Sequence, residues 1–386
     1  MNQTTLQILF ALLRSAVCGT LLTDEERATF SQEQLSDLFK MSQKHDIAHL
    51  LVLGLKKNDL IPKTAVDIEK VMLKALYRYE RLNYEYIQVC SALESVKIPF
   101  IPLKGSILRD YYPEAWMRTS CDVDLLVHKE DLENAVSYLT ENLNYVVKER
   151  GTHDVALSSP IGNSVELHFD LVEEGRANNA ISILSSVWDN VSLYKDCNYR
   201  YEMSDAFFYF YHIAHMAKHI ENGGCGIRPF IDLWILDNIE GINQNERDVL
   251  LSDGGLLKFA DVARKLSKVW FGCETADEVS LQLQKFLLIG GVYGTADNRV
   301  AIQQNKKGGR LGYILSRVFI PFSKLKRYYP VLEKHPWLMP FMQIRRWFML
   351  LRPDVAKLAK KEIASNKSIE KSKADQMNCF LDNLGL

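Results

Sequence analysis

Residues 103–127 read LKGSILRDYYPEAWMRTSCDVDLLV and end with two aspartates, one residue apart, inside an apolar run. Side chains in a β-strand alternate between faces, so Asp122 and Asp124 share one face while Val123 points to the other. A rise of about 3.3 Å per residue places their Cα atoms about 6.5–7 Å apart. Carboxylates are costly to bury without partners. The pattern therefore predicts a strand whose two acids are compensated by a ligand or a charge.

Two carboxylates at this spacing suit a divalent-cation site, because Mg²⁺ takes oxygen ligands, usually one or two carboxylates plus substrate phosphates. An exposed strand end with two solvated acids is the alternative. Upstream, Lys104, Gly105 and Ser106 stand between an apolar strand and a helical segment, and Arg118 adds positive charge. Glycine lets the backbone approach a ligand, and amides at a helix N-terminus face an anion. The stretch thus has the order of a phosphoryl-transfer site, although an ordinary strand-to-helix turn also explains the Lys-Gly-Ser run.

The rest of the chain places this stretch in a mixed fold. It has 386 residues, 47% hydrophobic and 25% charged, as in a globular protein of about two or three domains. Apolar spacing is helical in residues 1–95, and strand and helix patterns alternate in residues 96–200. Helical spacing returns in residues 201–298 and in a basic region, residues 299–386, whose polar tail from about residue 366 is expected to fray. We expect an α+β core with a mixed sheet, flanked by N-terminal and C-terminal helical regions.

Seven cysteines are scattered without a C-x-x-C pair, so neither a disulfide framework nor a zinc ribbon is indicated, and a reducing compartment fits. The opening segment is apolar, but no basic residue precedes its apolar run and Arg14 interrupts it, which predicts a helix rather than a signal peptide. No stretch reaches the ~18 uninterrupted apolar residues of a spanning helix. We expect a cytoplasmic protein, either free or peripheral to the membrane.

The motifs L-K-G, Y-Y-P, R-x-x-x-D-x-D-L-L-V and V-E-L-H, with H-x-x-K-H and G-I-R further along, resemble the bacterial nucleotidyltransferase family proteins. That group belongs to the DNA polymerase β-like nucleotidyltransferase superfamily, whose signature is a Gly-Ser turn followed by D-x-D or D-x-E on the next strand. The likeness covers roughly residues 99–236. It implies a polymerase β-like core and Mg²⁺-dependent transfer of a nucleoside monophosphate from an NTP, expected to be ATP, to an unidentified acceptor with release of pyrophosphate.

The resemblance also implies that Asp122 and Asp124 bind two Mg²⁺ ions, with Mn²⁺ as an alternative, and that a third carboxylate on a neighbouring strand completes the site. Glu166 is the candidate, because the period of two in SVELHFDL places Glu166, His168 and Asp170 on one face. This strand follows the turn PIGN, which predicts a hairpin. A solvated strand residue is the alternative for Glu166. The residues expected to contact the nucleotide are Lys104, Gly105, Ser106, Arg118, His168, His215, Lys218, His219 and Arg228.

Three histidines lie on one face of a predicted helix after residue 204. His212, His215 and His219 recur at i, i+3 and i+7, with Lys218 beside them. Three interpretations are open: a wall of the nucleotide cleft, ordinary packing, or a zinc site. No carboxylate or cysteine stands in a recognised ligand pattern with these histidines.

The loop ENGGCGIRP follows that helix and is expected to place Arg228 at the cleft, although a plain helix C-terminal turn explains its glycines equally well. Asp232 lies four residues beyond Arg228 and is a candidate partner for the guanidinium. A structural salt bridge is the alternative for Asp232.

The segment 299–361 is strongly basic, with 15 Lys and Arg residues against two acids, and interleaves them with aromatic and aliphatic residues. RNA phosphates or an anionic membrane surface would be attracted to it, and a solvated basic helical face is the alternative.

Two rival functions remain open. One is a nucleotide-binding or interaction protein on the same fold without turnover, which fits the fifteen residues between Ser106 and Asp122, more than in many superfamily members. The other is a zinc-dependent hydrolase centred on the histidine helix.

Overall fold

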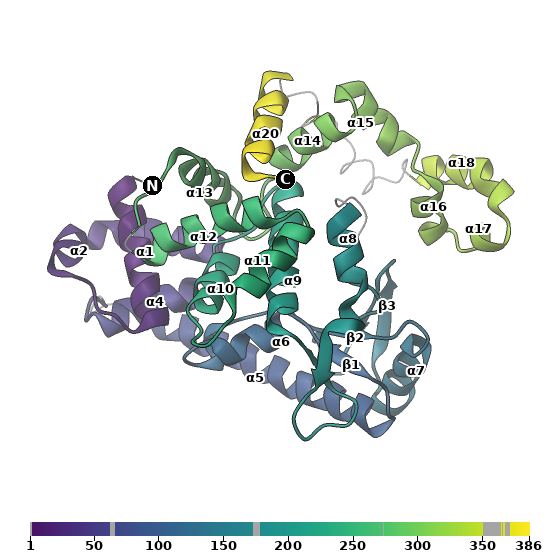
Figure 1. The fold of residues 1–386 in the computed structure, drawn as a ribbon, viewed down its shortest axis with the longest axis horizontal. Coiled ribbons are helices and arrows are strands. Elements are labelled where there is room, and N and C mark those ends of the chain that lie inside the picture. The colour runs from purple at the N-terminus through teal and green to yellow at the C-terminus, as the bar shows by residue number, and fades with distance from the viewer. Residues whose placement is uncertain are drawn as a thin grey trace. The chain divides into compact units, whose positions relative to one another are not determined.

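The computed structural model describes residues 2–61, 66–172, 178–272, 274–349, 364, 366 and 371–386. It divides into two compact units, Met1–Met216 with Ile227–Gln284, and Ala217–Gly226 with Lys285–Leu386. Figure 1 labels many of their helices and strands. The division into residues 1–95, 96–200, 201–298 and 299–386 stays a prediction.

The helices that begin before residue 290 include the predicted N-terminal layer. They are α1 (Gln3–Cys18), α2 (Asp24–Thr29), α3 (Leu35–Lys44), α4 (Ala48–Lys57), α5 (Val66–Ser95), α6 (Gly105–Leu108), α7 (Leu132–Leu143), α8 (Asn178–Ser185), α9 (Asp205–Glu221), α10 (Arg228–Asp237), α11 (Gln244–Asp253), α12 (Leu257–Phe271) and α13 (Glu278–Gly290). In the layer, α1 packs against α4, where a Cβ on Gly54 would lie 2.2 Å from the carbonyl oxygen of Leu12. Only glycine allows the two backbones to approach this closely.

A five-stranded mixed sheet forms the α+β core, as predicted. Its strands, in spatial order, are β1 (Phe100–Pro102), β2 (Asp122–Val127), β5 (Ser164–His168), β4 (Asp154–Ser158) and β3 (Val146–Arg150). β2 and β5 are parallel, and the other neighbours are antiparallel. The PIGN turn joins β4 to β5 as the predicted hairpin. A separate ribbon pairs β6 (Val191–Leu193) with β7 (Tyr201–Met203).

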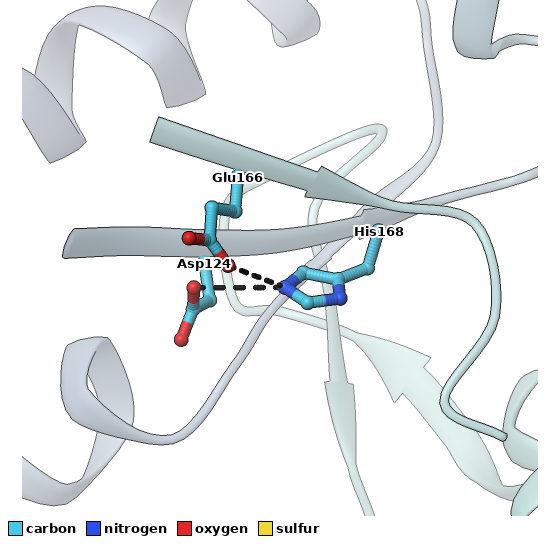
Figure 2. A group of neighbouring side chains, drawn as sticks. All are labelled: Asp124, Glu166 and His168. Carbon is cyan, nitrogen blue, oxygen red and sulfur yellow. Dashed lines mark ion pairs between the residues drawn. The ribbon is translucent and has the colours of Figure 1, made fainter. Parts of the chain in front are cut away.

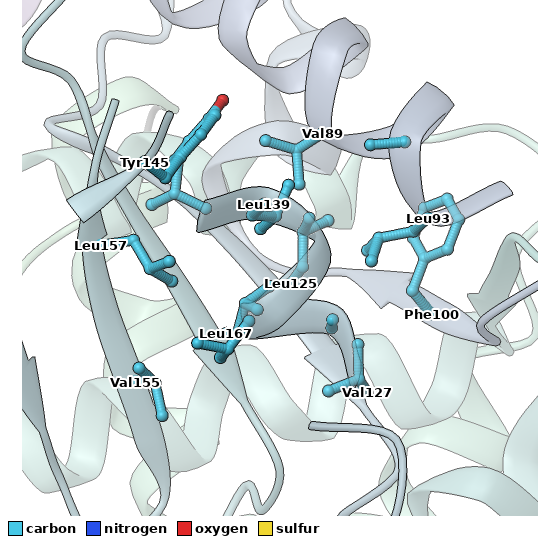
Figure 3. Packing of buried hydrophobic residues seen from close by; sticks show 14 of the residues in the cluster. Val89, Leu93, Phe100, Leu125, Val127, Leu139, Tyr145, Val155, Leu157 and Leu167 are labelled. Atoms are coloured by element: carbon cyan, nitrogen blue, oxygen red, sulfur yellow. The ribbon is translucent and has the colours of Figure 1, made fainter. Parts of the chain in front are cut away.

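One face of the sheet is apolar and is covered by α5 and α7. Val123 and Leu125 of β2 and Val165 and Leu167 of β5 are fully buried among apolar side chains of these two helices. Figure 3 shows Leu125 and Leu167 in this cluster, with Val89 of α5 and Leu139 of α7. Burying one such side chain stabilises the fold by roughly 1.5–3 kcal/mol. Alternation then turns the polar residues of β2 and β5 to the opposite face.

Two local expectations need correction. β5 ends at His168, so Asp170 is not on the strand, and its side-chain oxygen accepts a hydrogen bond from the Val172 amide. The segment after Gly105 is helical only to Leu108 and continues as a 3₁₀ turn, Arg109–Tyr111. At Asp170 a side-chain hydrogen bond competes with continuation of the strand. After Leu108 the tighter hydrogen bonds of a 3₁₀ turn replace those of the α-helix.

The second unit is helical. It contains α14 (Ala296–Lys306), α15 (Gly309–Val318), α16 (Phe322–Tyr328), α17 (Val331–Lys334), α18 (Met339–Met349) and α20 (Lys371–Leu384). The expectation of a frayed tail is wrong for α20, because Ala374, Leu381 and Leu384 are buried and the helix packs on α14. Residues 350–361 of the basic segment lie outside the described residues. Among the residues that are described, no helix is long and apolar enough to cross a membrane.

Candidate active site

The polar face of β2 and β5 gathers the acidic residues. Asp124 is the register partner of Glu166, and Asp122 is the partner of Ser164. Neighbouring strands lie about 4.8 Å apart, so side chains at paired positions on one face are adjacent. The structure therefore brings Glu166, proposed from sequence as the third acid, beside Asp124.

His168 stands next to both carboxylates (Figure 2). Its Nε2 lies 3.6 Å from Asp124 Oδ1 and 3.6 Å from Glu166 Oε2. Burial alone would lower the pKa of His168, but the two carboxylates raise it to about 9. The imidazolium is therefore the favoured form near neutral pH when no metal is bound.

The two aspartates of the D-x-D motif differ electrostatically. Burial, followed by the charges of Asp124 and Glu166, raises the pKa of Asp122 to about 6. Burial also acts to raise the pKa of Asp124, yet His168 and Lys104 hold it below its usual value. Three neighbouring carboxylates thus repel one another, which is the situation that a cation relieves.

The Lys-Gly-Ser turn lies directly against β2. The Leu103 amide donates to the Asp124 carbonyl at 3.0 Å, and Lys104 has a positive φ of 26°. A Cβ on Gly105 would lie 3.1 Å from the Cβ of Ser120, which is tighter than an ordinary contact, so a side chain here would require Ser120 to move by a few tenths of an ångström. The Ser106 Oγ is buried and has no hydrogen-bond partner within the described part of the chain.

A narrow pocket extends from His168 across the sheet end to α9. Its lining residues are Lys104, His153, His168, Asp170, Leu171, Leu184, Tyr211 and His215. The Lys104 Nζ lies 5.3 Å from the centroid of the Tyr211 ring, a cation–π distance. The pocket thus brings together Lys104, His168 and His215, three of the residues predicted to contact the nucleotide. Lys218 and His219 belong to the second unit, and their role stays a prediction.

Arg118 is buried and paired. Its Nε and Nη2 donate to the two carboxylate oxygens of Asp232 at 2.7 and 2.9 Å, and Tyr112 also donates to this carboxylate at 2.7 Å. Burial alone would raise the pKa of Asp232, but Arg118 keeps it lowered. The candidate pairing of Asp232 with Arg228 is therefore wrong, because Asp232 forms a buried salt bridge with Arg118 and Arg228 pairs with Asp46.

Arg228 binds Asp46, a residue that sequence reasoning missed. Arg228 Nη1 donates to Asp46 Oδ2 at 3.1 Å and to the Thr119 carbonyl at 2.7 Å. Arg78 donates to the same Oδ2 at 2.6 Å and to the Ser120 carbonyl at 2.8 Å. Two guanidinium groups thereby hold the backbone that leads into Asp122. No local pattern marks Asp46, because its partners are distant in sequence.

Asp124, Glu166 and His168 offer ligand atoms that all lie within 4.8 Å of one another, and this donor set suits a divalent ion. The sequence predicted Asp122, Asp124 and Glu166 as ligands, so the ligand role of Asp122 stays a prediction. Within the described residues, α9 contributes no histidine to such a group. His212 is buried and its ring Nε2 instead bonds the Pro229 carbonyl at 3.1 Å.

A family model described as "Uncharacterised nucleotidyltransferase" matches residues 31–272, which is more than half of the chain. The matched range contains the sheet, the Lys-Gly-Ser turn and the ion pairs described above. No curated protein and no solved structure matches the chain.

Proposed function

We propose that this chain, which belongs to the uncharacterised nucleotidyltransferase family, transfers a nucleoside monophosphate from an NTP to an acceptor hydroxyl. ATP is the first choice of NTP. The acceptor oxygen forms a bond to the α-phosphorus. The bond from that phosphorus to the oxygen bridging the β-phosphate breaks, and pyrophosphate leaves with its electron pair. The hydroxyl proton passes to solvent.

The observation that carries this proposal is the pairing of Asp124 with Glu166 across parallel strands, with Asp122 on the same face. These three carboxylates would hold two Mg²⁺ ions, or Mn²⁺ in their place. Bound divalent ions would lower the pKa of the acceptor hydroxyl and neutralise the charge of the leaving pyrophosphate. Glu166 would hold the ion on the acceptor side and would favour loss of the hydroxyl proton.

The phosphate side is proposed to be the Lys-Gly-Ser turn. Lys104 lines the pocket beside His168 and His215, and it is the basic residue of that turn. Gly105 keeps the backbone close to β2, and the Ser106 hydroxyl, which has no hydrogen-bond partner among the described residues, is proposed to donate to a phosphate oxygen. Arg118 and Arg228 are proposed to position the site, because Asp232 and Asp46 already pair with them.

The acceptor, or the membrane or RNA that contains it, is proposed to bind to the basic second unit. In its described part, Trp337, Phe341 and Phe348 are exposed, with 68%, 60% and 69% of their surface accessible. Exposed aromatic rings among basic residues suit an anionic membrane surface. RNA, attracted by the same charge, is the competing partner.

The decisive experiment is calorimetric titration of each of the four NTPs, with and without Mg²⁺, into wild type and an Asp122→Asn/Asp124→Asn variant. We expect metal-dependent binding that the double variant loses. Glu114→Gln, an exposed acid between the turn and β2, is the matched control and should bind as wild type does.

Pyrophosphate release in an acceptor screen then separates an enzyme from its inactive rival. Metal-dependent NTP binding without release from any acceptor pool would favour the nucleotide-binding protein. Absence of NTP binding by wild type would contradict both.

A further inference from the structure

His168 has a buried ring nitrogen with no hydrogen-bond partner in the described structure. Only 9% of the residue is exposed, and Nε2 is an unsatisfied polar atom. Its two neighbours, Asp124 Oδ1 and Glu166 Oε2, are each 3.6 Å away, which is too long for a hydrogen bond. A buried polar atom without a hydrogen bond requires an explanation, and an ion held between this nitrogen and the two carboxylate oxygens provides one.

The distances from His168 Nε2 to the two carboxylate oxygens are close to those between neighbouring ligands of one ion. Two ligand atoms, each about 2.1 Å from one ion, lie about 3.0 Å apart at a right angle and about 3.4 Å apart at the tetrahedral angle. The observed separations of 3.6 Å are slightly wider, and the three ligand atoms all lie within 4.8 Å of one another. Figure 2 shows the ring of His168 directed at the gap between the carboxylates.

The scaffold fixes these donors on one side and leaves the other side open. Glu166 and His168 alternate on β5, and Asp124 faces them from β2, so all three project from paired strands of one sheet. Glu166 keeps 31% of its side chain exposed, which leaves room for water or a substrate oxygen. Three protein ligands with an open position are the arrangement of a catalytic rather than a structural metal centre.

We propose that His168 is a nitrogen ligand of this centre, together with Asp124 and Glu166, and that the centre binds Mn²⁺ in preference to Mg²⁺. Mg²⁺ takes oxygen ligands almost exclusively, whereas imidazole suits first-row transition ions and carboxylates suit Mn²⁺. The proposal departs from the assignment of His168 to the nucleotide. It rests on the proposed function only in supposing that the substrate phosphate fills the open position.

The alternative is that His168 serves as a resident cation that neutralises the carboxylates and leaves when the ion enters. The two roles predict opposite effects of removing the ring. Loss of a ligand weakens metal binding, whereas loss of a competing positive charge strengthens it.

The test uses Mn²⁺ alone, without nucleotide, on the full chain. Binding is titrated through the loss of the free-ion electron paramagnetic resonance signal in wild type, His168→Ala and His168→Gln, and Mg²⁺ is titrated in competition. We expect both variants to bind Mn²⁺ at least about tenfold more weakly, with Mg²⁺ affinity changed by less than about threefold. His128→Ala is the matched control, because its ring stacks on Trp188 and, among the described residues, it belongs neither to the pocket lining nor to the ligand group.

A second readout needs only wild type, so it does not depend on the variants folding. Electron spin-echo modulation of bound Mn²⁺ should show a directly coordinated ¹⁴N nucleus, and ¹⁵N labelling of histidine should change the modulation. Bound Mn²⁺ without nitrogen modulation, or tighter Mn²⁺ binding by His168→Ala, would overturn the proposal.

The failure of this inference and of the proposed function can be told apart. Nitrogen-coordinated Mn²⁺ in a protein that binds no NTP would support the centre and contradict nucleotidyl transfer. Metal-dependent NTP binding with an all-oxygen ion would do the reverse.

Discussion

Arg118 and Asp232, 114 residues apart in the chain, form a buried two-point ion pair in which two nitrogens of the guanidinium meet both carboxylate oxygens. Arg118 stands four residues before Asp122, and Asp232 is in α10. The pair therefore ties the segment that enters β2 to a helix from a distant part of the sequence. It connects the stability of the fold with the placement of the carboxylates.

Asp232→Asn should destabilise the protein by about 3–5 kcal/mol, because it leaves the Arg118 guanidinium buried without a compensating charge. The urea midpoint, followed by circular dichroism, measures this loss. Glu133→Gln removes a similar two-point partner from Arg150 at the surface, where the side chains are 66% and 50% exposed, and should cost about 1 kcal/mol or less. Equal effects of the two substitutions would contradict a structural role for the buried pair.

Asp124→Asn should abolish nucleotidyl transfer while the fold stays intact, since the amide keeps the shape of the side chain but loses its charge. We expect pyrophosphate release to fall by at least about 100-fold. The measurement is release with whichever acceptor supports it, alongside a thermal unfolding curve. Turnover equal to that of wild type would refute the assignment of Asp124 to the metal.

Lys104→Met should weaken NTP binding by at least about tenfold, because a charge-assisted contact to phosphate is worth roughly 1.5–3 kcal/mol. Calorimetry in Mg²⁺ reports the change. Lys129→Met is the matched control, since Lys129 also lies over an aromatic ring, 5.9 Å from Phe169, but does not line the pocket. If the two variants lose affinity alike, the turn has no specific role in holding phosphate.

His49 should make stability fall with acidification. Burial lowers its pKa from the ordinary 6.5 to about 4, and its Nε2 bonds the Met117 carbonyl at 2.8 Å. Above pH 6.5 both the folded and unfolded states hold neutral His49. Below that pH the unfolded state takes up the proton first, so the free energy of unfolding falls until about pH 4, by up to about 3 kcal/mol.

His49→Gln keeps a donor for the carbonyl but cannot titrate. Urea midpoints between about pH 7.5 and about pH 4.5 should therefore fall less for this variant than for wild type. Parallel curves for the two proteins would show that His49 does not contribute to the acid sensitivity.

The second unit should bind vesicles that contain anionic lipid, and Trp337→Ala/Phe341→Ala should weaken this binding by removing rings that insert at the interface. Co-sedimentation with anionic and with zwitterionic vesicles measures both charge and ring contributions. Leu73→Ala/Tyr77→Ala removes an equally exposed apolar pair from α5 and should have no effect. Salt-sensitive RNA binding without vesicle binding would identify the other partner.

Much of the core was accessible from local pattern. The alternation in DVDLLV and SVELH predicts β2 and β5 because one face of each strand must be apolar to be buried, and PIGN predicts the hairpin that joins β4 to β5. The same alternation places Asp122 and Asp124 on one face. The end of the chain was misjudged, because the apolar positions Ala374, Leu381 and Leu384 are sparse and their stripe has meaning only against α14.

The sequence contained the carboxylates, their shared face and the Lys-Gly-Ser turn, since each depends on residues within a few positions of one another. The interaction partners of these groups were decided only by the tertiary structure. Nothing local distinguishes Asp46 as the partner of Arg228, or Arg118 as the partner of Asp232. The position of His168 against Asp124 follows from the parallel register of β2 and β5, which is set by packing on α5 and α7. Contacts between distant segments depend on how whole elements pack, and local periodicity does not encode that information.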